Sequence, residues 1–447
     1  MKQGKSMTDP MKTLRERPMG LYQVLVVALC VLINVIDGFD ILALTFAAPV
    51  VVKEWSLTPE QTGSVFSANL IGIGVGAFLF ALIADLIGRR PVILFGTLLM
   101  SVGMITTSRV DGLVGLAVCR LVTGLGIGAM VTTAGTLAIE YSSLRWRKLS
   151  VALVVIGYPI GGAIGGPIAG WLLEHRGWRD IFFFGGMVTV VLFPILLWRL
   201  PESLEFLLER QPRKALARFN GYAARVGLDP LAALPPPGAP VSAAGQFIEP
   251  WRPAHRRATI TLCAMYPLFM FTFYFFVNWH TKLATERGLA VAEAVHMSSL
   301  WSMAGIAGGI VFGLVATRLR LTLLVPALAV ILSAGIASFG LLPATPAVLN
   351  LAALLLGFFM WGSSATIYSV IALCFPVRVR ASGIGLVVTI GRIGSALGPW
   401  AAGLMRGAGY DWSVVAPVLA VPAVFAALLI LTLRPEEGQL AGRASRS

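Results

Sequence analysis

Charged side chains are scarce in this sequence, and their scarcity excludes a soluble protein. Asp, Glu, Lys and Arg make up 13% of the 447 residues, whereas hydrophobic residues make up 57%. A soluble domain carries about 25% charged residues. A chain of this length with so few charges has too little polar surface to cover itself, so lipid must cover it. The composition therefore predicts a polytopic protein embedded in a lipid bilayer.

Cysteine is also rare, and its pattern excludes several kinds of site. The four cysteines stand singly in apolar segments, and no CxxC pair occurs. This pattern predicts neither a disulfide framework nor a metal site. No phosphate-binding loop and no set of nucleophile and base occur at a suitable spacing. We therefore expect no enzymatic activity and no cofactor, and any transport must draw its energy from an ion gradient.

The excess of basic residues does not indicate nucleic acid as a partner. The formal net charge is +14, but Lys and Arg occur in short runs between apolar stretches. A groove-binding surface would need a basic stripe with interleaved aromatic residues. Basic runs at residues 89–90, 145–148, 318–320 and 378–380 are instead typical of loops that stay on the cytoplasmic side. Both termini are therefore predicted to be cytoplasmic.

Twelve apolar runs are long enough to cross a bilayer as helices, which takes about 20 residues each. The runs cover residues 21–50, 62–84, 91–108, 113–139, 149–173, 180–200, 258–280, 291–316, 321–342, 347–375, 382–405 and 413–433. The predicted organisation is a cytoplasmic tail (1–20), a six-helix bundle (21–200), a cytoplasmic linker (201–257), a second six-helix bundle (258–433) and a second cytoplasmic tail (434–447). We expect one amphipathic helix in the linker, over residues 202–222.

The two bundles resemble repeats of each other. Gly166-Pro167 in the fifth run and Gly398-Pro399 in the eleventh are separated by 232 positions, and the same offset separates Asp85 from Thr317. An offset shared by two motifs indicates duplication. Two parallel six-helix halves around a midplane site are the architecture of major facilitators. The predicted fold is therefore an all-α membrane protein with twelve transmembrane helices in two pseudo-symmetric halves.

Several motifs resemble those of the major facilitator superfamily. Asp85-Leu86-Ile87-Gly88-Arg89-Arg90 resembles the signature of the loop between the second and third helices, although Ala81 replaces its leading glycine. Arg120 with Gly124 and Gly126 resembles the motif of the fourth helix. The glycine-rich run at residues 157–170 resembles the motif of the fifth helix.

Within that superfamily, Asp37-Gly38-Phe39-Asp40 followed by Ala48-Pro49 resembles the first-helix motif of the aromatic acid:proton symporters. Leu200-Pro201-Glu202-Ser203 and Gly391-Arg392-Ile393-Gly394 agree with that family. The resemblance covers nearly the whole chain. It implies import of a small aromatic carboxylate such as 4-hydroxybenzoate, protocatechuate or benzoate, driven by protons.

Asp37, Asp40 and Arg120 are the candidates for proton coupling. The two aspartates are three residues apart, so on a helix they share a face with Cβ atoms about 5–6 Å apart. Carboxylates inside a spanning helix normally face an interior cavity, and two this close resist simultaneous ionisation. Such a pair can bind and release a proton. Arg120 lies at a similar depth to Asp40, ~10 Å below the outer surface, so a pair with either aspartate is feasible; a purely structural pairing is the alternative.

Arg392, near the middle of the eleventh helix, is the candidate for binding the substrate carboxylate. Arginine offers a bidentate fork that fits a carboxylate. Asn34 continues the stripe of the two aspartates. Tyr266, Tyr274 and Tyr368 combine a ring that can stack on an aromatic substrate with a polar tip. We expect these residues to bind the substrate.

The cytoplasmic ends of the helices carry candidate gating residues, which are Asp85, Gly88, Arg89, Arg90 and Glu140. Glu140 is expected to contact Arg89 or Arg90, and Asp85 to act similarly near the end of the eleventh helix.

Small residues and a histidine complete the candidate set. Gly166, Pro167, Gly398 and Pro399 are expected to allow close helix packing. His280 is predicted to lie near the outer rim of the seventh helix, where it either titrates as a coupling residue or has an interfacial role.

These patterns together predict a monomeric, proton-coupled secondary transporter that imports a small aromatic carboxylate by alternating access. The nearest alternatives keep the fold and change the cargo to another organic acid, a sugar or a drug, by import or by efflux. An alternative of another class is a transporter-like sensor that binds its ligand without moving it.

Overall fold

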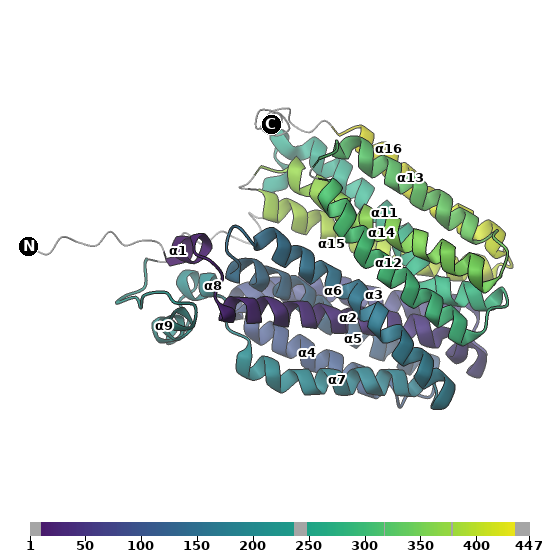
Figure 1. The fold of residues 1–447 in the computed structure, drawn as a ribbon, viewed down its shortest axis with the longest axis horizontal. Helices are drawn as coiled ribbons and strands as arrows, with labels where there is room; N and C mark the ends of the chain where they lie inside the picture. Colours follow the sequence, from purple (N-terminus) through teal and green to yellow (C-terminus); the bar gives the residue numbers. More distant parts are fainter. Residues whose placement is uncertain (1–9, 237–247, 317, 377–378, 434–447) are drawn as a thin grey trace, which may run out of the picture.

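Twelve long helices make up most of the protein in the computed structural model, which describes residues 10–236, 248–316, 318–376 and 379–433 (Figure 1). The first six are α2 (Leu21–Glu54), α3 (Pro59–Ile87), α4 (Arg89–Thr107), α5 (Leu113–Tyr141), α6 (Arg147–His175) and α7 (Trp178–Arg199). The second six are α11 (Pro253–Glu286), α12 (Val291–Val315), α13 (Leu321–Phe339), α14 (Pro346–Cys374), α15 (Arg380–Gly407) and α16 (Trp412–Leu431). Each predicted apolar run is matched by one helix, and the described residues form no strand. The predicted fold is confirmed.

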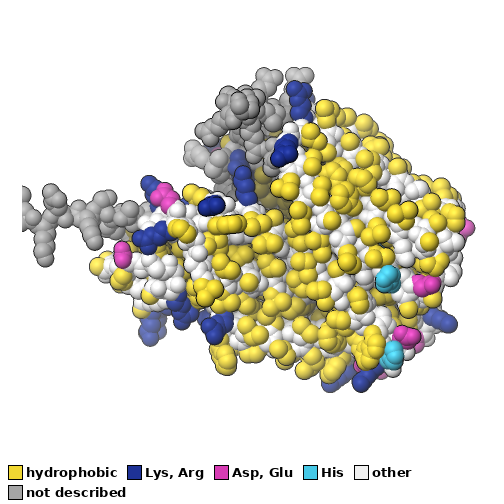
Figure 2. Space-filling model, in the orientation of Figure 1, with side chains coloured by type: hydrophobic (Ala, Val, Ile, Leu, Met, Phe, Trp, Pro, Cys, Tyr) yellow, Lys and Arg dark blue, Asp and Glu magenta, His cyan; other side chains and the backbone are white. Residues whose placement is uncertain are grey.

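Hydrophobic side chains cover the sides of the bundle, whereas Lys and Arg lie mainly toward the end that also holds α1, α8 and α9 (Figure 2). Val114 and Trp198 are 76% and 78% exposed, although both are strongly apolar. Hydrocarbon accepts such side chains, and the helices satisfy their backbone groups internally. The surface is therefore that of helices packed in lipid.

The two halves are related by the offset seen in the sequence. The hydroxyl of Thr45 in α2 donates a hydrogen bond to the carbonyl oxygen of Val277 in α11, at 3.3 Å. These residues are 232 positions apart, the same separation as that of the two glycine–proline motifs. The first helices of the two halves thus meet at equivalent positions, as expected near a pseudo-twofold axis.

Contacts between the halves gather toward the end that holds the α2–α3 and α11–α12 turns. A Cβ atom on Gly63 would lie 2.8 Å from the carbonyl oxygen of Pro399, and one on Gly403 would lie 2.6 Å from that of Pro59. Toward the opposite end, a Cβ atom on Gly385 would meet nothing within 4 Å. Figure 2 shows the surface hollowed toward that end, beside the residues drawn in grey. The halves therefore pack closely at the end that holds these turns.

The seventh spanning helix is longer than expected. The sequence predicts an end at His280, but α11 continues to Glu286. Its last turn is supported by an ion pair between Lys282 Nζ and Glu286 Oε1, at 2.5 Å and four residues apart. The mixed segment at 281–286, which contains Thr281, Lys282, Thr285 and Glu286, therefore extends the helix instead of ending it.

The expected single linker helix at residues 202–222 is wrong, because the segment forms two helices. These are α8 (Leu204–Glu209) and α9 (Ala215–Arg225). Pro212 lies between them, and Gln211 and Lys214 adopt positive φ angles of 47° and 64°, which no α-helix continues.

Two short elements lie outside the predicted helices. A 3₁₀ turn, η1 (Glu249–Trp251), precedes α11, and α1 (Pro10–Glu16) precedes α2. Arg15 of α1 pairs with Glu205 of α8, with Nη2 and Oε1 2.5 Å apart. The first helix and the linker are thus attached to each other at the basic end of the bundle.

Gly398 and Gly385 of α15 form a matched pair for testing helix packing. A Cβ atom on Gly398 would lie 2.1 Å from the carbonyl oxygen of Phe271, whereas Gly385 has open space. We expect Gly398→Ala to destabilise the protein by about 1–3 kcal/mol through overpacking. Gly385→Ala should be neutral or slightly stabilising, because alanine favours helix. Thermal unfolding in detergent measures both, and equal melting temperatures for the two variants would contradict the close α11–α15 packing.

Candidate functional site

Arg120 and Asp40 form an ion pair in the interior of the first half. Arg120 Nη1 lies 3.0 Å from Asp40 Oδ1, and both side chains are 0% exposed. Arg120 Nη2 donates to the hydroxyls of Thr107 and Thr123, at 3.1 Å each. The guanidinium also lies 4.8 Å from the ring centroid of Phe182. Residues of α2, α4, α5 and α7 therefore surround one buried charge pair. Of the two pairings that the sequence left open, the structure contains the one with Asp40.

Asp37 is surrounded differently from Asp40, although it lies one helical turn away. It is 1% exposed, and neither of its carboxylate oxygens has a hydrogen-bond partner among the described residues. An ionised carboxylate is costly in such a place without a donor. Asp37 is therefore stable there as the neutral acid, or when a ligand or water donates a hydrogen bond to it.

Arg392 lies in α15 beside three tyrosines of the second half, which are Tyr266, Tyr274 and Tyr368. The rings of Tyr266 and Tyr368 meet edge to face, with centroids 6.0 Å apart. None of the ion pairs among the described residues involves Arg392. The structure thus brings the three predicted tyrosines together around Arg392, which was also predicted to bind the substrate and has no carboxylate partner among the described residues.

Two glycines position this cluster. A Cβ atom on Gly391 would lie 2.2 Å from the ring of Tyr266, and one on Gly394 would lie 1.9 Å from the carbonyl oxygen of Pro267. Both approaches are too close for any side chain. The glycines on either side of Arg392 therefore let α11 lie directly against α15, which places the arginine among the tyrosines.

Tyr158 of α6 is a further interior residue of this region, and sequence reasoning missed it. Its hydroxyl is buried without a hydrogen-bond partner among the described residues. The titratable groups near it are Tyr274, Arg392, Asp40 and Asp37. Its ring centroid lies 5.0 Å from that of Trp361 in α14. The available signal was a single polar aromatic residue inside the glycine-rich run at residues 157–170.

Asn34 lies away from the Arg392 cluster. Its side-chain amide donates to the carbonyl oxygen of Cys30, at 3.1 Å, and its Cβ atom packs against Gly157 of α6. The structure gives no contact between Asn34 and the tyrosines, so its role in binding stays a prediction.

The interfacial role considered for His280 is wrong. The histidine is 1% exposed, because α11 continues for six residues beyond it. Its Nδ1 lies 3.0 Å from the carbonyl oxygens of Phe276 and Val277, and Ser298 Oγ lies 2.7 Å from Nε2. Two carbonyl acceptors require a proton on Nδ1. His280 is therefore held between α11 and α12 with both ring nitrogens satisfied.

The candidate gating residues meet at the basic end of the first half. Arg89 Nε lies 3.5 Å from Glu140 Oε1, and Arg89 Nη2 lies 3.3 Å from Asp85 Oδ1. Ser203 donates a hydrogen bond to Glu140. Arg90 instead donates to the carbonyl oxygen of Leu197, at 2.6 Å. Arg89 is therefore the basic residue that contacts Glu140.

Glu202 completes this group and was not predicted as a site residue. Its Oε1 accepts hydrogen bonds from the backbone N–H groups of Arg89 at 2.8 Å and Arg90 at 3.1 Å, at the start of α4. A carboxylate in this place satisfies free donors and the positive end of the helix dipole. Gly88 has a φ angle of 107°, and a Cβ atom there would lie 2.3 Å from the carboxylate. Glycine thus permits both the turn and the cap.

The structure also shows the contacts of two residues that were predicted to allow close helix packing. Gly166 lies against Ser299 of α12, across the boundary between the halves, one residue before Pro167. The carbonyl oxygen of Pro399 accepts a hydrogen bond from the indole of Trp279, at 3.0 Å. Thr317 and Arg378 lie outside the described residues.

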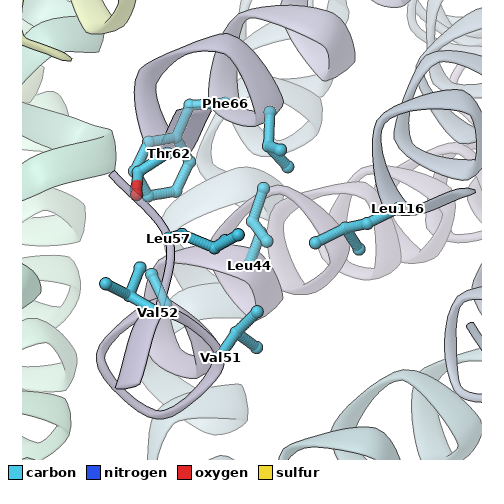
Figure 3. A pocket seen from close by; sticks show the side chains of 9 residues that line it. Leu44, Val51, Val52, Leu57, Thr62, Phe66 and Leu116 are labelled. Carbon is cyan, nitrogen blue, oxygen red and sulfur yellow. The ribbon is translucent and has the colours of Figure 1, made fainter. Parts of the chain in front are cut away.

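A small pocket lies near the end at which the two halves pack closely, and its lining includes none of the candidate site residues described above. Figure 3 shows its lining of apolar side chains and Thr62, which are Leu44, Ala48, Val51, Val52, Leu57, Thr62, Val65, Phe66 and Leu116. It contains no charged group that could hold a carboxylate.

Comparison with known proteins identifies the family of this chain. A family model described as Major Facilitator Superfamily matches residues 30–399. The chain belongs to this superfamily. A gallate transporter of Pseudomonas putida is 30% identical to this facilitator over 420 residues, which cover 93% of this chain and 92% of the relative. The 4-hydroxybenzoate transporter PcaK of Acinetobacter baylyi is 28% identical over 432 residues, covering 95% and 94%.

A 3-(3-hydroxy-phenyl)propionate transporter of Escherichia coli is 28% identical to this facilitator over 392 residues, covering 86% of this chain and 87% of the relative. These relatives place the facilitator among the aromatic acid carriers of the superfamily, so the predicted family is confirmed.

Solved structures share the fold of this facilitator. The xylose transporter XylE from E. coli, in a partially occluded inward open conformation, matches with a TM-score of 0.74 and 15% identity, covering 94% of this chain and 99% of that one. A bacterial homologue of the human lysosomal transporter Spinster, inward-facing and unoccupied, gives 0.69 and 16%, covering 95% and 98%.

The buried pair of Asp40 and Arg120 can be tested by a double-mutant cycle. We expect Asp40→Asn and Arg120→Gln each to destabilise the facilitator by about 3–5 kcal/mol, because each leaves one buried charge unpaired. The double variant should be more stable than either single variant. Asp411→Asn, which removes an exposed pair with Arg406, should change the melting temperature little. Additive losses in the cycle would show that the two charges do not stabilise each other.

Proposed function

We propose that this facilitator imports a small aromatic carboxylate together with protons across the bacterial inner membrane, as a monomer that works by alternating access. The observation that carries the proposal is Arg392, a cation in the middle of α15 with no carboxylate partner among the described residues. A charge within the membrane requires a counter-charge. A substrate carboxylate supplies one, and an arginine fork binds it with two hydrogen bonds.

The aromatic part of the substrate is supported by what surrounds Arg392. Tyr266, Tyr274 and Tyr368 offer rings next to the guanidinium, and aromatic pairs add attraction beyond the burial of apolar area. The names of the relatives, which transport gallate, 4-hydroxybenzoate and 3-(3-hydroxy-phenyl)propionate, agree with such a cargo.

Proton coupling is assigned to Asp37, Asp40 and Arg120. Asp37 has no partner in this structure and can exchange a proton without breaking an ion pair. Protonation of Asp40 weakens its bond to Arg120, and this frees the loaded carrier to change its conformation. One proton carried with a monoanion is electroneutral. Each pH unit then contributes ~1.4 kcal/mol, which is about tenfold accumulation.

The arrangement of the halves supports an inward-open state. The closely packed end holds the turns that the distribution of basic residues assigns to the outside. We infer that the bundles at 21–200 and 258–433 rock against each other, joined by the linker at 201–257, between the tails at 1–20 and 434–447. The group of Asp85, Gly88, Arg89, Arg90 and Glu140 would act as the cytoplasmic gate.

Uptake of radiolabelled 4-hydroxybenzoate into proteoliposomes tests this function. We expect accumulation that depends on an inward proton gradient. Competition by unlabelled benzoate, protocatechuate, gentisate and vanillate should exceed competition by shikimate and glucose. Asp37→Asn and Asp40→Asn should lose gradient-driven accumulation, because the proton site is gone. If either variant, correctly inserted, still concentrates the substrate, the coupling mechanism is wrong.

Arg392 can be tested through the charge of the ligand. Arg392→Gln should weaken binding of 4-hydroxybenzoate by about 10- to 100-fold, since a hydrogen bond to a charged group contributes about 1.5–3 kcal/mol. Binding of the uncharged 4-hydroxybenzamide should change far less. Calorimetry on purified protein measures both ligands. An equal loss for the acid and the amide would indicate that Arg392 does not bind the carboxylate.

A further inference from the structure

The interior of the facilitator holds two unpaired polar groups of opposite character. Arg392 in the second half can only donate hydrogen bonds, whereas an ionised Asp37 in the first half can only accept them. Neither has a partner of opposite charge among the described residues. Arg392 has a hydrogen bond with Tyr274, whereas both carboxylate oxygens of Asp37 are buried without one, an exception that requires an explanation.

Tyr158 links these two groups in space. Its nearby titratable groups include Asp37 and Asp40 of the first half and Tyr274 and Arg392 of the second, and its buried hydroxyl has no partner among the described residues. Its place is fixed by close backbone packing, because a Cβ atom on Gly38 would lie 2.1 Å from the carbonyl oxygen of Tyr158. The residue that follows Asp37 is thus in contact with the backbone of Tyr158.

Aromatic side chains extend from this position. The ring centroids of Tyr158 and Trp361 are 5.0 Å apart, and those of Trp361 and Phe273 are 5.5 Å apart. A flat ring can therefore stack or pack edge-on beside Tyr158. The free phenol of Tyr158 thus adjoins an aromatic surface.

A ligand that satisfies all of these groups has a definite chemistry. It needs an anionic acceptor at one end for Arg392, a flat apolar middle, and a hydrogen-bond donor at the other end for Asp37. A benzoate without a ring hydroxyl satisfies only the first two needs and leaves a buried acceptor unpaired, which lowers affinity. A hydroxylated aromatic acid satisfies all three.

We propose that Asp37 and Tyr158 form a subsite for the ring hydroxyl of a hydroxylated aromatic carboxylate, and that Tyr158 is a residue that determines specificity. The hydroxyl donates to Asp37 and exchanges a hydrogen bond with the phenol of Tyr158, while the carboxylate lies at Arg392. This proposal rests on the proposed function, since it requires that an aromatic acid binds between the two halves.

The test compares ligands that differ in one group. Binding of 4-hydroxybenzoate, 4-methoxybenzoate and benzoate to the purified full-length protein is measured by calorimetry, without a proton gradient. The methoxy group keeps an oxygen but cannot donate. We expect the hydroxy acid to bind about tenfold or more tightly than the methoxy acid, as loss of a hydrogen bond to a charged group predicts.

Tyr158→Phe should reduce this preference to within about threefold, because phenylalanine keeps the ring contact with Trp361 and removes the hydroxyl. Asp37→Asn should also reduce it, by replacing the carboxylate with a weaker acceptor. Tyr410→Phe is the matched control, because Tyr410 is exposed beyond the end of α15. It should leave the preference unchanged.

The outcomes separate this proposal from the proposed function. If no aromatic acid binds, the proposed function itself fails. If the hydroxy and methoxy acids bind equally well, the hydroxyl subsite is absent while the function stands. If the preference is present but survives Tyr158→Phe at full size, Tyr158 does not determine it and the assignment is overturned.

Discussion

The buried ion pair between Asp40 and Arg120 is the interaction on which the rest of the first half depends. It lies at the meeting point of α2, α4, α5 and α7, with threonine hydroxyls and one aromatic ring completing the shell of the arginine. A lone charge in hydrocarbon is strongly disfavoured, so these helices can pack in few other registers. With the pair fixed, the adjacent turn of α2 places Asp37 in the interior and Gly38 against α6. The position of Tyr158 follows from that contact.

The proposed function depends on a contrast between two aspartate and arginine sets. In one set the two residues form an ion pair, and in the other they do not. Asp40 and Arg120 satisfy each other within one half, so they hold helices together. Asp37 and Arg392 belong to different halves and have no such partners among the described residues. A ligand or a proton that satisfies an unpaired group changes the balance between conformations, because it binds them with different affinity. Glycines on either side of Arg392 let α11 and α15 lie close together.

Much of the fold could be predicted because lipid imposes a simple rule on composition. Twelve apolar runs gave twelve helices, and the 232-residue offset reappears where Thr45 meets Val277. The wrong predictions concern segments whose structure does not depend on contact with lipid. Residues 281–286 are mostly polar yet continue α11, supported by an ion pair that sequence hydropathy does not register. The linker divides at Pro212, between two residues with positive φ angles, and this break is set by local backbone geometry. His280 was expected at the rim because the predicted helix ended there, whereas α11 continues beyond it.

The sequence by itself determined the class of protein, the number and approximate ends of the spanning helices, the family, and the residue types available for binding an anion and a proton. It could do so because each depends on composition or on a short motif. Only the tertiary structure decided that Arg120 pairs with Asp40, that Arg89 and not Arg90 reaches Glu140, and that Tyr158 of the first half contacts Trp361 of the second. These facts depend on which helix faces approach each other, and close glycine contacts between distant segments set those faces.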